Sequence, residues 1–263
     1  MCSTCGCGEA DVRLTTLGGE GSTGHGHGHA HQHDHDHGDP DHHHVPVERD
    51  EELRTHTLEL EVAVLAKNDG LAALNRDWLT ERGITALNLM SSPGAGKTTL
   101  LERTIAAAGR PVTVIEGDQE TLFDAERIRR AGARAVQVNT GAGCHLDAAM
   151  VSRALEELQP DRDSIVFIEN VGNLVCPALF DLGEKRKVVV ISVTEGDDKP
   201  LKYPHIFAAA DLVVLNKTDL LPYVDFDPER LTRDARTINP GVQVLPLSAT
   251  TGENFGAWLE WLY

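Results

Sequence analysis

A glycine-rich segment between a predicted strand and a predicted helix constrains the fold of this chain more than any other feature. Residues 84–90 form an apolar run, and residues 100–105 have helical spacing. Between them lies Ser-Ser-Pro-Gly-Ala-Gly-Lys-Thr-Thr, residues 91–99. A strand, a glycine-rich turn and a helix in this order are typical of a phosphate-binding loop, whose backbone N–H groups and helix N-terminus bind phosphate oxygens. The alternative is a serine/glycine turn that caps an ordinary helix, and Gly-Lys-Thr at this place disfavours it.

Individual residues of this loop have separate predicted roles. Lys97 is expected to reach the β- and γ-phosphates, and the Thr98 hydroxyl is expected to ligate Mg²⁺. Ser91 departs from the common G-x-x-x-x-G-K-[ST] pattern, because it stands where the first Gly belongs. The residues predicted to bind the nucleotide phosphates are Gly94, Ala95, Gly96, Lys97, Thr98 and Thr99.

Strand and helix patterns alternate along the rest of the chain. The predicted strands are residues 112–115, 135–138, 165–168, 188–191, 212–215 and 242–245, and the predicted helices are residues 125–131, 146–158, 228–238 and 253–262. Apolar strands that alternate with helices predict an α/β fold, a mostly parallel sheet with helices on both faces. Ligands of such sheets bind beyond the carboxyl ends of the strands, where the motifs of this chain fall.

A second motif indicates which nucleotide is bound. Asn-Lys-Thr-Asp, residues 216–219, directly follows the strand at 212–215. The Asp219 carboxylate can accept two hydrogen bonds from the N–H edge of guanine, which adenine does not offer. Alone, these four residues could be a polar turn that caps a helix, but their placement after a strand favours guanine. The residues predicted to bind guanine are Asn216, Lys217 and Asp219, with Ser248 and Ala249 at the end of the next strand.

Acidic residues at two other strand ends are candidates for the catalytic chemistry. Glu169 follows the strand at 165–168 and is expected to hold the Mg²⁺ shell, while the Gly172 N–H senses the γ-phosphate. The common GTPase form of this motif is D-x-x-G, so Glu169 is a second departure. Asp118 is expected to align the attacking water or to hold the metal, with Glu120 as a weaker candidate; either acid could instead be a helix cap. The predicted catalytic set is therefore Lys97, Asp118, Glu169 and Gly172, and the predicted magnesium set is Thr98, Asp118 and Glu169.

The first 48 residues differ in composition from the rest. They hold ten of the 13 histidines and few large apolar side chains, so the predicted division is a disordered, metal-binding tail at 1–48 and a P-loop GTPase domain at 49–263. The GTPase domain is expected to begin with a helical segment, which Asn-Asp-Gly at 68–70 breaks in two.

Three thiols in six residues at the N-terminus predict a metal site. Cys2, Cys5 and Cys7 can wrap one soft or borderline ion, and glycines between them permit tight turns. Removal of Met1 would make the Cys2 amine a fourth donor, which suits square-planar Ni²⁺, although tetrahedral Zn²⁺ would also be bound.

A histidine tract follows the thiols. Imidazoles suit Ni, Cu and Zn alike, so the tract is interpreted as a store for several ions rather than as a solvated linker. Its residues are His25, His27, His29, His31, His33, His35, His37, His42, His43 and His44.

Two further cysteines and one histidine lie in loops after strands. Cys144 and His145 precede a predicted helix, and Cys176 lies four residues after Gly172. Each of these residues, considered alone, could equally be packed in the core or bind a metal. Together they form an incomplete tetrahedral set, whose fourth ligand would come from water or a second subunit. The short distance in sequence from Gly172 predicts that metal occupancy and nucleotide state are coupled.

Composition narrows the function further. The chain has 24 basic and 41 acidic side chains, a net charge of −17, which argues against nucleic acid as a partner. No apolar stretch approaches the roughly 20 residues that span a bilayer, and no signal-peptide pattern begins the chain. We therefore expect a cytoplasmic protein with no membrane partner, in which the cysteines stay reduced.

Together the motifs resemble those of the HypB family, the nickel-inserting GTPases of [NiFe]-hydrogenase maturation, over essentially the full chain. The matching segments are the Cys2–Cys7 cluster, the histidine tract, residues 92–98, Cys144-His145, residues 169–177 and residues 216–219. The departures at Ser91 and Glu169 are shared by that family.

The resemblance implies a P-loop GTPase of the signal-recognition-particle/MinD type. Such a protein forms a homodimer promoted by GTP and metal, hydrolyses GTP slowly, and acts with the chaperone HypA to deliver nickel to the hydrogenase large subunit. The resemblance also implies a tight nickel site at Cys2, Cys5 and Cys7 and a second metal site at Cys144, His145 and Cys176. GTP, Mg²⁺, Ni²⁺ and Zn²⁺ are the expected ligands.

Two other functions stay open at the level of sequence. A related GTPase that serves urease also combines a P-loop with a histidine-rich tail, although the Cys2–Cys7 cluster argues against it. The second alternative is a nickel storage protein whose nucleotide site is not catalytic, and turnover of GTP would distinguish an enzyme from it.

Overall fold

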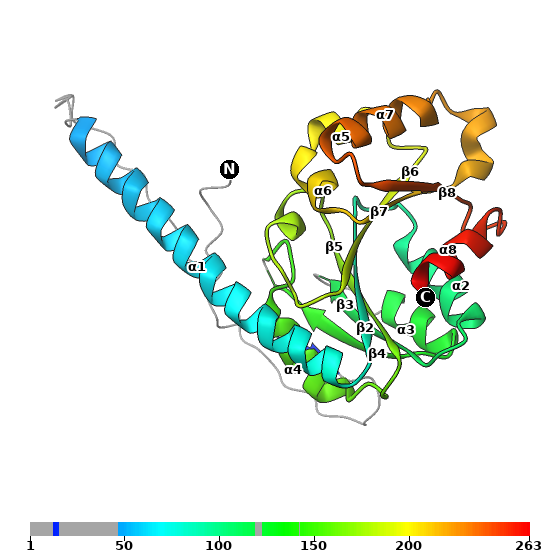
Figure 1. The fold of residues 1–263 in the computed structure, drawn as a ribbon, viewed down its shortest axis with the longest axis horizontal. Coiled ribbons are helices and arrows are strands. Elements are labelled where there is room, and N and C mark those ends of the chain that lie inside the picture. Colours follow the sequence, from blue (N-terminus) through cyan, green and yellow to red (C-terminus); the bar gives the residue numbers. More distant parts are fainter. Residues whose placement is uncertain (1–12, 16–46, 119–122, 142) are drawn as a thin grey trace, which may run out of the picture. The chain divides into compact units, whose positions relative to one another are not determined.

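Eight strands form a single sheet in the part of the chain that the structure, a computed structural model, describes: residues 13–15, 47–118, 123–141 and 143–263. Their order is β1-β4-β3-β5-β2-β6-β7-β8, and β2 lies at the centre (Figure 1). The seven strands from β2 to β8 run parallel, and β1 pairs antiparallel with β4. The predicted α/β class with a mostly parallel sheet is confirmed.

The strands are β1 (Arg13–Thr15), β2 (Thr85–Ser91), β3 (Val112–Asp118), β4 (Arg134–Asn139), β5 (Ile165–Gly172), β6 (Arg186–Ser192), β7 (Leu212–Asn216) and β8 (Gln243–Pro246). The α-helices are α1 (Val47–Glu81), α2 (Lys97–Ala107), α3 (Phe123–Arg130), α4 (Ala148–Leu158), α5 (Lys199–Lys202), α6 (Pro204–Ala209), α7 (Pro228–Ile238) and α8 (Phe255–Leu262). Two short 3₁₀ helices, η1 (Cys176–Ala178) and η2 (Thr218–Tyr223), follow β5 and β7.

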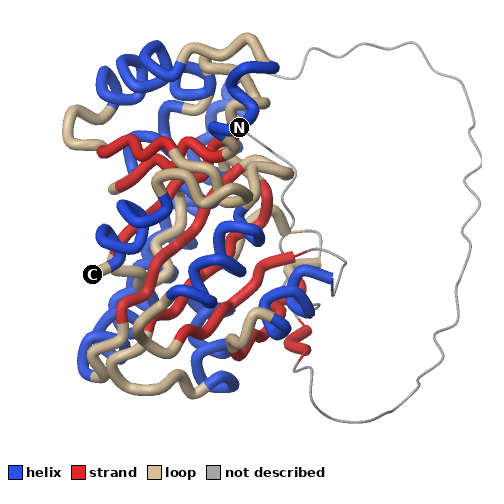
Figure 2. Tube along the Cα trace, turned by 90° about the vertical axis from the view of Figure 1, so that its right-hand side faces the viewer, coloured by secondary structure: helices blue, strands red, loops and turns tan. Residues whose placement is uncertain are grey.

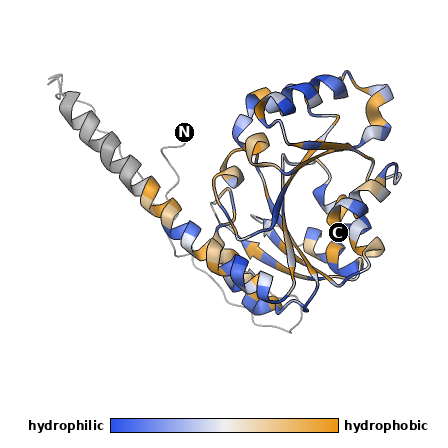
Figure 3. Cartoon of the chain, in the orientation of Figure 1, coloured by the Kyte–Doolittle hydropathy of each residue, from blue (hydrophilic) through white to orange (hydrophobic). Residues whose placement is uncertain are grey.

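Alternate residues of the central strands enter separate apolar cores, as the two-residue period of a strand requires. Leu87 and Phe167 belong to the core covered by α2, α3 and α8, whereas Ala86 and Val166 belong to a core covered by α4 and the end of α1. A third core lies under α6 and α7, at β6 and β7. Figure 2 shows the helices around the sheet, and Figure 3 shows the mainly hydrophilic residues of α7. Because both faces of the sheet are covered, apolar residues predominate in the central strands and point to both faces.

Helix α1 differs from the expectation. It continues through Asn68, Asp69 and Gly70, where the sequence predicted a break. The Asn68 side chain does not compete for its own backbone, because it donates to the Asp181 carbonyl (2.8 Å) and accepts from the Ala148 N–H (2.9 Å). Tertiary hydrogen bonds thus override the local preference of Asn. Residues 65–81 of α1 belong to the compact unit that holds the sheet, and residues 47–64 of α1 belong to a separate unit.

Strand β1 is the other unexpected element, because it lies within the segment predicted to be disordered. Its three residues pair with Gln137, Val138 and Asn139 of β4, on the edge of the sheet away from β3. An edge strand offers unpaired backbone groups that any extended segment can satisfy, and a three-residue addition carries little sequence signal. Helices α5 and α6 are likewise absent from the elements predicted from the sequence.

The carboxyl ends of the parallel strands meet at one edge of the sheet. The register places Ser91 of β2 beside Gly172 of β5, and Glu116 of β3 beside Glu169 of β5. On the other side of β2, the end of β6 at Ser192 lies beside Asn216 of β7. The motifs predicted at separate strand ends therefore converge on this edge. Among the described residues, no helix has the length and apolar character needed to cross a bilayer.

Replacing Gly70 by Ala is expected to stabilise the protein. Gly70 is exposed in the interior of α1, and a Cβ atom added there has no neighbour within 4 Å. Alanine restricts the unfolded chain, so the free energy of unfolding should rise by about 0.5–1 kcal/mol in urea titrations. The control is Gly183→Ala, which should destabilise, because Gly183 has φ of +91° and its Cβ would lie 2.6 Å from the Ala72 carbonyl oxygen. A destabilised Gly70→Ala variant would contradict the uninterrupted helix.

Candidate functional site

The loop between β2 and α2 has the geometry of a phosphate-binding loop. Gly96 is the N-cap of α2 and has φ of +96°, a left-handed conformation that favours glycine. A Cβ atom there would lie 2.5 Å from the Asn216 side-chain nitrogen, so close packing also requires glycine. No side chain of the described residues caps this helix end, so its first-turn N–H groups and partial positive charge are oriented to bind an anion.

Ser91, the departure from the common pattern, has an evident role in the structure. The Lys97 Nζ donates a hydrogen bond to Ser91 Oγ at 2.6 Å, and Ser91 Oγ donates to the Ser92 carbonyl oxygen at 2.6 Å. Burial lowers the pKa of Lys97, and nearby carboxylates, first Glu169, oppose the shift. The serine hydroxyl therefore holds a partly desolvated ammonium group inside the loop.

A cavity of about 540 Å³ opens over this loop. The ends of β3 and β5 and the side chain of Lys217 also line it, and four of its lining residues are acids. These acids are Glu116, Asp118, Asp124 and Glu169. Of the residues predicted from sequence, Gly94 to Thr99, Asp118, Glu169, Gly172 and Lys217 line the cavity, whereas Asp219, Ser248 and Ala249 are not among its lining residues.

Two of the acids are buried carboxyl groups on adjacent strands. Glu169 Oε1 accepts from Thr98 Oγ1 at 3.0 Å. Glu169 Oε2 and Glu116 Oε2 have no hydrogen-bond partner among the residues that the structure describes. Burial, followed by the charge of Glu169, raises the pKa of Glu116 to about 9. Burial likewise raises the pKa of Glu169, against the pull of Lys97. Two buried carboxyl groups with unsatisfied oxygens and a threonine hydroxyl are a donor set that fits Mg²⁺.

Three charged residues around the cavity are not predicted from the sequence. Glu116 directly follows the apolar residues of a strand, so its charge at that place is the only sequence signal of a role in the site. Asp124 and Arg127 lie on α3; Arg127 donates to Glu102 (2.6 Å), to Asp124 (3.2 Å) and to Thr99 Oγ1 (3.2 Å). This network ties α3 to the start of α2. Asp124 and Arg127 are three residues apart, a spacing that is common for ion pairs on helix surfaces. The sequence therefore contains no signal that places these two residues at the cavity.

Gly172 is placed against the phosphate-binding loop. A Cβ atom on Gly172 would lie 3.0 Å from Pro93 Cγ and 3.1 Å from the Pro93 backbone nitrogen. A side chain at this position would press against Pro93, so displacement of the phosphate-binding loop and displacement of Gly172 are linked by close contact.

Hydrogen bonds join the predicted guanine-site residues to the same loop. Asn216 donates to the Ala95 carbonyl (2.9 Å) and accepts from the Ala249 N–H (3.0 Å), and Lys217 Nζ donates to the Gly94 carbonyl (2.7 Å). Ser248 Oγ donates to Asp219 Oδ1 at 2.6 Å. The Asn-Lys-Thr-Asp motif, the 248–249 turn and the phosphate-binding loop thus form one hydrogen-bonded unit.

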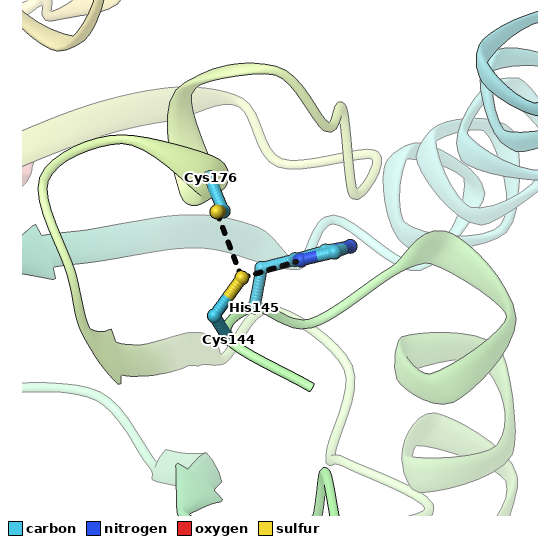
Figure 4. A group of neighbouring side chains, drawn as sticks. All are labelled: Cys144, His145 and Cys176. Atoms are coloured by element: carbon cyan, nitrogen blue, oxygen red, sulfur yellow. Dashed lines mark hydrogen bonds between the residues drawn. The ribbon is translucent and has the colours of Figure 1, made fainter. Parts of the chain in front are cut away.

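The second centre joins Cys144, His145 and Cys176. The Cys144 sulfur lies 2.7 Å from the Cys176 sulfur and 3.6 Å from His145 Nδ1 (Figure 4). The potential ligand atoms of all three residues lie within 4.8 Å of one another. The structure therefore brings together residues that are 32 positions apart in sequence. Within the described residues, this is the one such group of three or more metal-binding side chains.

The environment of His145 favours its metal-binding form. Its ring stacks on Phe180, with ring centroids 3.9 Å apart. Burial lowers the pKa of His145, and Asp147 opposes the shift. A neutral imidazole can donate a nitrogen lone pair to a metal, whereas an imidazolium cannot. The predicted tail sites, Cys2, Cys5, Cys7 and the ten histidines at 25–44, lie outside the described residues, as does Glu120.

Comparison with known proteins decides the family. The nucleotide-binding domain of the CobW/HypB/UreG family matches residues 85–246, the span from the first residue of β2 to the last of β8. The hydrogenase maturation factor HypB of Azotobacter chroococcum is 57% identical over 211 residues, which cover 80% of this chain and 69% of that protein. This chain belongs to the HypB family.

Solved HypB structures have the same fold. HypB from Helicobacter pylori in complex with nickel superimposes with a TM-score of 0.72 at 38% identity, covering 74% of this chain and 93% of that chain. HypB from Archaeoglobus fulgidus superimposes with a TM-score of 0.70 at 44% identity, covering 75% and 98%. The resemblance that the motifs indicated is confirmed, and the cavity over the phosphate-binding loop lies in a HypB-type nucleotide-binding domain.

Replacing Glu116 by Gln is expected to stabilise the ligand-free protein in a pH-dependent way. The pKa of Glu116 is about 9 in the fold against 4.5 for an unperturbed carboxyl group, so the cost of its burial to folding is absent below about pH 4.5 and grows as the pH rises toward 9. Urea unfolding should give little difference between Glu116→Gln and the unchanged protein at pH 5, and a gain of a few kcal/mol at pH 8.

The exposed Glu157 provides a control for this measurement. Glu157→Gln should change the free energy of unfolding by less than about 0.5 kcal/mol at either pH. A Glu116→Gln variant that is less stable than the unchanged protein at pH 8 would contradict the buried, unsatisfied state of this carboxyl group.

Proposed function

We propose that this chain is a GTP-hydrolysing nickel metallochaperone of hydrogenase maturation. One observation carries the proposal: β5 supplies Glu169 and Gly172 to the nucleotide cavity and leads within four residues to Cys176 of the metal centre. The names of the relatives, hydrogenase maturation factors, and the nickel complex of the Helicobacter pylori protein support hydrogenase and nickel as its target and cargo.

The phosphate-binding loop would hold the triphosphate. Backbone N–H groups of residues 94–99 and the N-terminus of α2 surround the phosphates, and Lys97 leaves Ser91 to reach the β- and γ-phosphates. Asp219 selects guanine by accepting from its N–H edge, while the backbone of Ser248 and Ala249 binds the guanine carbonyl. These roles are supported by the hydrogen bonds that join the three segments.

Thr98 and Glu169 would hold Mg²⁺, with Asp118 and the newly identified Glu116 as further oxygen donors. Bound Mg²⁺ neutralises charge on the β- and γ-phosphates. The chain itself orients the reactants: Asp118 aligns the attacking water, and the Gly172 N–H contacts the γ-phosphate. Hydrolysis is expected to be slow, as suits a switch, and loss of the γ-phosphate frees the end of β5.

Nickel is the cargo of the second centre. Two thiolates from Cys144 and Cys176 and the neutral His145 ring provide three donors, and water or a second subunit provides the fourth. Zn²⁺ suits the same donors. In the tail, Cys2, Cys5 and Cys7 would form a tight nickel site and the histidine tract a store. Thiolate sites need a reducing compartment, which supports the predicted cytoplasmic location.

The partners follow from the same chemistry. A homodimer promoted by GTP and metal completes the coordination at the second centre, a HypA-type chaperone exchanges nickel with it, and the hydrogenase large subunit receives the ion. The proposed division of the chain remains a metal-binding tail at 1–48 and a GTPase domain at 49–263.

Phosphate release tests the enzymatic part of the proposal. The unchanged protein should release phosphate from GTP and not from ATP. Asp118→Ala should lower the rate by about 10²-fold or more while it retains GTP affinity, because positioning of the water is lost and the loop is intact. The exposed Asp161, at the opposite end of β5, offers a control in Asp161→Ala. Unchanged turnover in Asp118→Ala would remove the assigned role, and equal turnover of ATP would remove the guanine assignment.

Absorption spectroscopy tests the metal centre. When Cys2, Cys5 and Cys7 are replaced by serine, Cys144 and Cys176 are the only thiols left among the five of the chain. Nickel should then produce a thiolate-to-metal charge-transfer band. Cys176→Ser should strongly weaken this band, and His145→Ala should raise the nickel dissociation constant at least about tenfold. The exposed His205 supplies the control, since His205→Ala should leave the titration unchanged. A band that survives Cys176→Ser would disprove the assigned ligand set.

A further inference from the structure

The side chain of Asn170 connects the nucleotide cavity to the metal centre. Asn170 lies between Glu169 and Gly172 on β5, is 1% exposed, and lines the nucleotide cavity. Its Oδ1 accepts from the backbone N–H of Val171 at 3.0 Å and from the backbone N–H of Leu146 at 3.2 Å. Leu146 directly follows His145, so one amide oxygen holds the cavity wall and the metal-binding loop together.

The other half of the amide is fixed as well. Asn170 Nδ2 donates to Asn88 Oδ1 at 3.3 Å, and Asn88 Nδ2 donates to Glu184 Oε1 at 3.1 Å. Asn88 is fully buried and Glu184 is 5% exposed. Rotation of the buried Asn170 amide away from Leu146 would therefore leave buried polar groups unsatisfied. This makes the bond to Leu146 a constraint rather than an incidental contact.

The far end of the metal-binding loop is anchored to a different element. The Ala148 N–H donates to Asn68 Oδ1 (2.9 Å), and the Ala148 carbonyl accepts from Asn75 Nδ2 (2.8 Å). Asn68 and Asn75 both belong to α1, which does not line the nucleotide cavity. Leu146 thus lies two residues from an anchored point, and a shift of Asn170 must be absorbed within residues 144–147.

A second, more exposed tie runs parallel to the first. Asn173 Nδ2 donates to the Cys144 carbonyl at 3.3 Å, and Asn173 lies directly after Gly172. The β5 end therefore contacts the loop on both sides of His145, at Cys144 and at Leu146. Movement of β5 would change the placement of Cys144 and His145 relative to Cys176.

We infer that Asn170 is a positioning residue that transmits the state of the γ-phosphate to the metal centre through its hydrogen bond to Leu146. The inference rests on the proposed GTP-driven nickel chaperone and names the side chain by which its two sites are coupled. The γ-phosphate contacts Gly172, the end of β5 shifts, and the Asn170 amide moves the loop that carries Cys144 and His145. Asn173 assists through its bond to the Cys144 carbonyl.

The test compares nickel affinities in two nucleotide states. The full chain with Cys2, Cys5 and Cys7 replaced by serine is titrated with Ni²⁺ in a metal buffer, with Mg²⁺ and either GDP or a non-hydrolysable GTP analogue, and the charge-transfer band is recorded. The measured quantity is the ratio of the two nickel dissociation constants. In the unchanged protein this ratio should differ from one. Asn170→Ala should shift the ratio toward one by a factor of about two to ten, the range that corresponds to one neutral hydrogen bond.

Asn75→Ala is the matched control. Asn75 is also a buried asparagine that bonds to the loop region, but from α1 rather than from β5. Because Asn68 still anchors the Ala148 N–H in this variant, Asn75→Ala should keep the ratio of the unchanged protein, even if it lowers stability. If Asn170→Ala does not fold, Asn173→Ala is measured instead, because Asn173 is only partly buried. It should shift the ratio of nickel dissociation constants in the same direction by a smaller amount.

Each outcome discriminates. A ratio that is unchanged in the Asn170→Ala and Asn173→Ala variants, or one that Asn75→Ala changes equally, overturns the role of Asn170 while GTP turnover and nickel binding stand. A ratio of one in the protein with an intact Asn170 overturns the coupling itself and the inference with it. A protein that neither hydrolyses GTP nor shows the charge-transfer band overturns the proposed function.

Discussion

The carboxyl end of β5 is the constraint on which both sites depend. It is central in the sheet, paired on one side with β2 and on the other with β3, so its last residues meet the phosphate-binding loop and the end of β3. Gly172 lies close against Pro93, where a Cβ atom would be tightly packed, and Asn170 is hydrogen bonded to the loop of Cys144 and His145. A displacement at this strand end is therefore shared by the nucleotide cavity and the metal centre.

The buried charged groups of the nucleotide cavity favour a ligand of complementary charge. Without ligand, the cavity encloses two carboxyl groups with raised pKa values and a lysine with a lowered one, all held at the expense of solvation. In the proposed function, a magnesium nucleotide would supply the opposite charges to each of them. Its binding would relieve the unfavourable burial of Glu116, Glu169 and Lys97 and would make free energy available to hold the end of β5 in one position. Hydrolysis would remove part of that interaction.

The sequence predicted most of the fold, because apolar strands and glycine-rich turns have local signatures. Helix α7 was predicted at Pro228–Ile238, as observed. The continuity of α1 was not predicted, since Asn68 is satisfied by Ala148 and Asp181, which are distant in sequence. Glu116 and Asn170 were missed for the same reason: their roles arise from neighbours across the sheet. Cys144, His145 and Cys176 were predicted as a set, and their proximity agrees with the structure.

The most direct test of the account is whether the metal centre responds to the γ-phosphate. Nickel K-edge X-ray absorption of the chain that keeps only Cys144 and Cys176 as thiols, recorded with GDP and then with a non-hydrolysable GTP analogue, measures the ligand geometry itself. The account predicts two different spectra, with sulfur ligands in at least one state. Identical spectra in the two states, at full nickel and nucleotide occupancy, would contradict it.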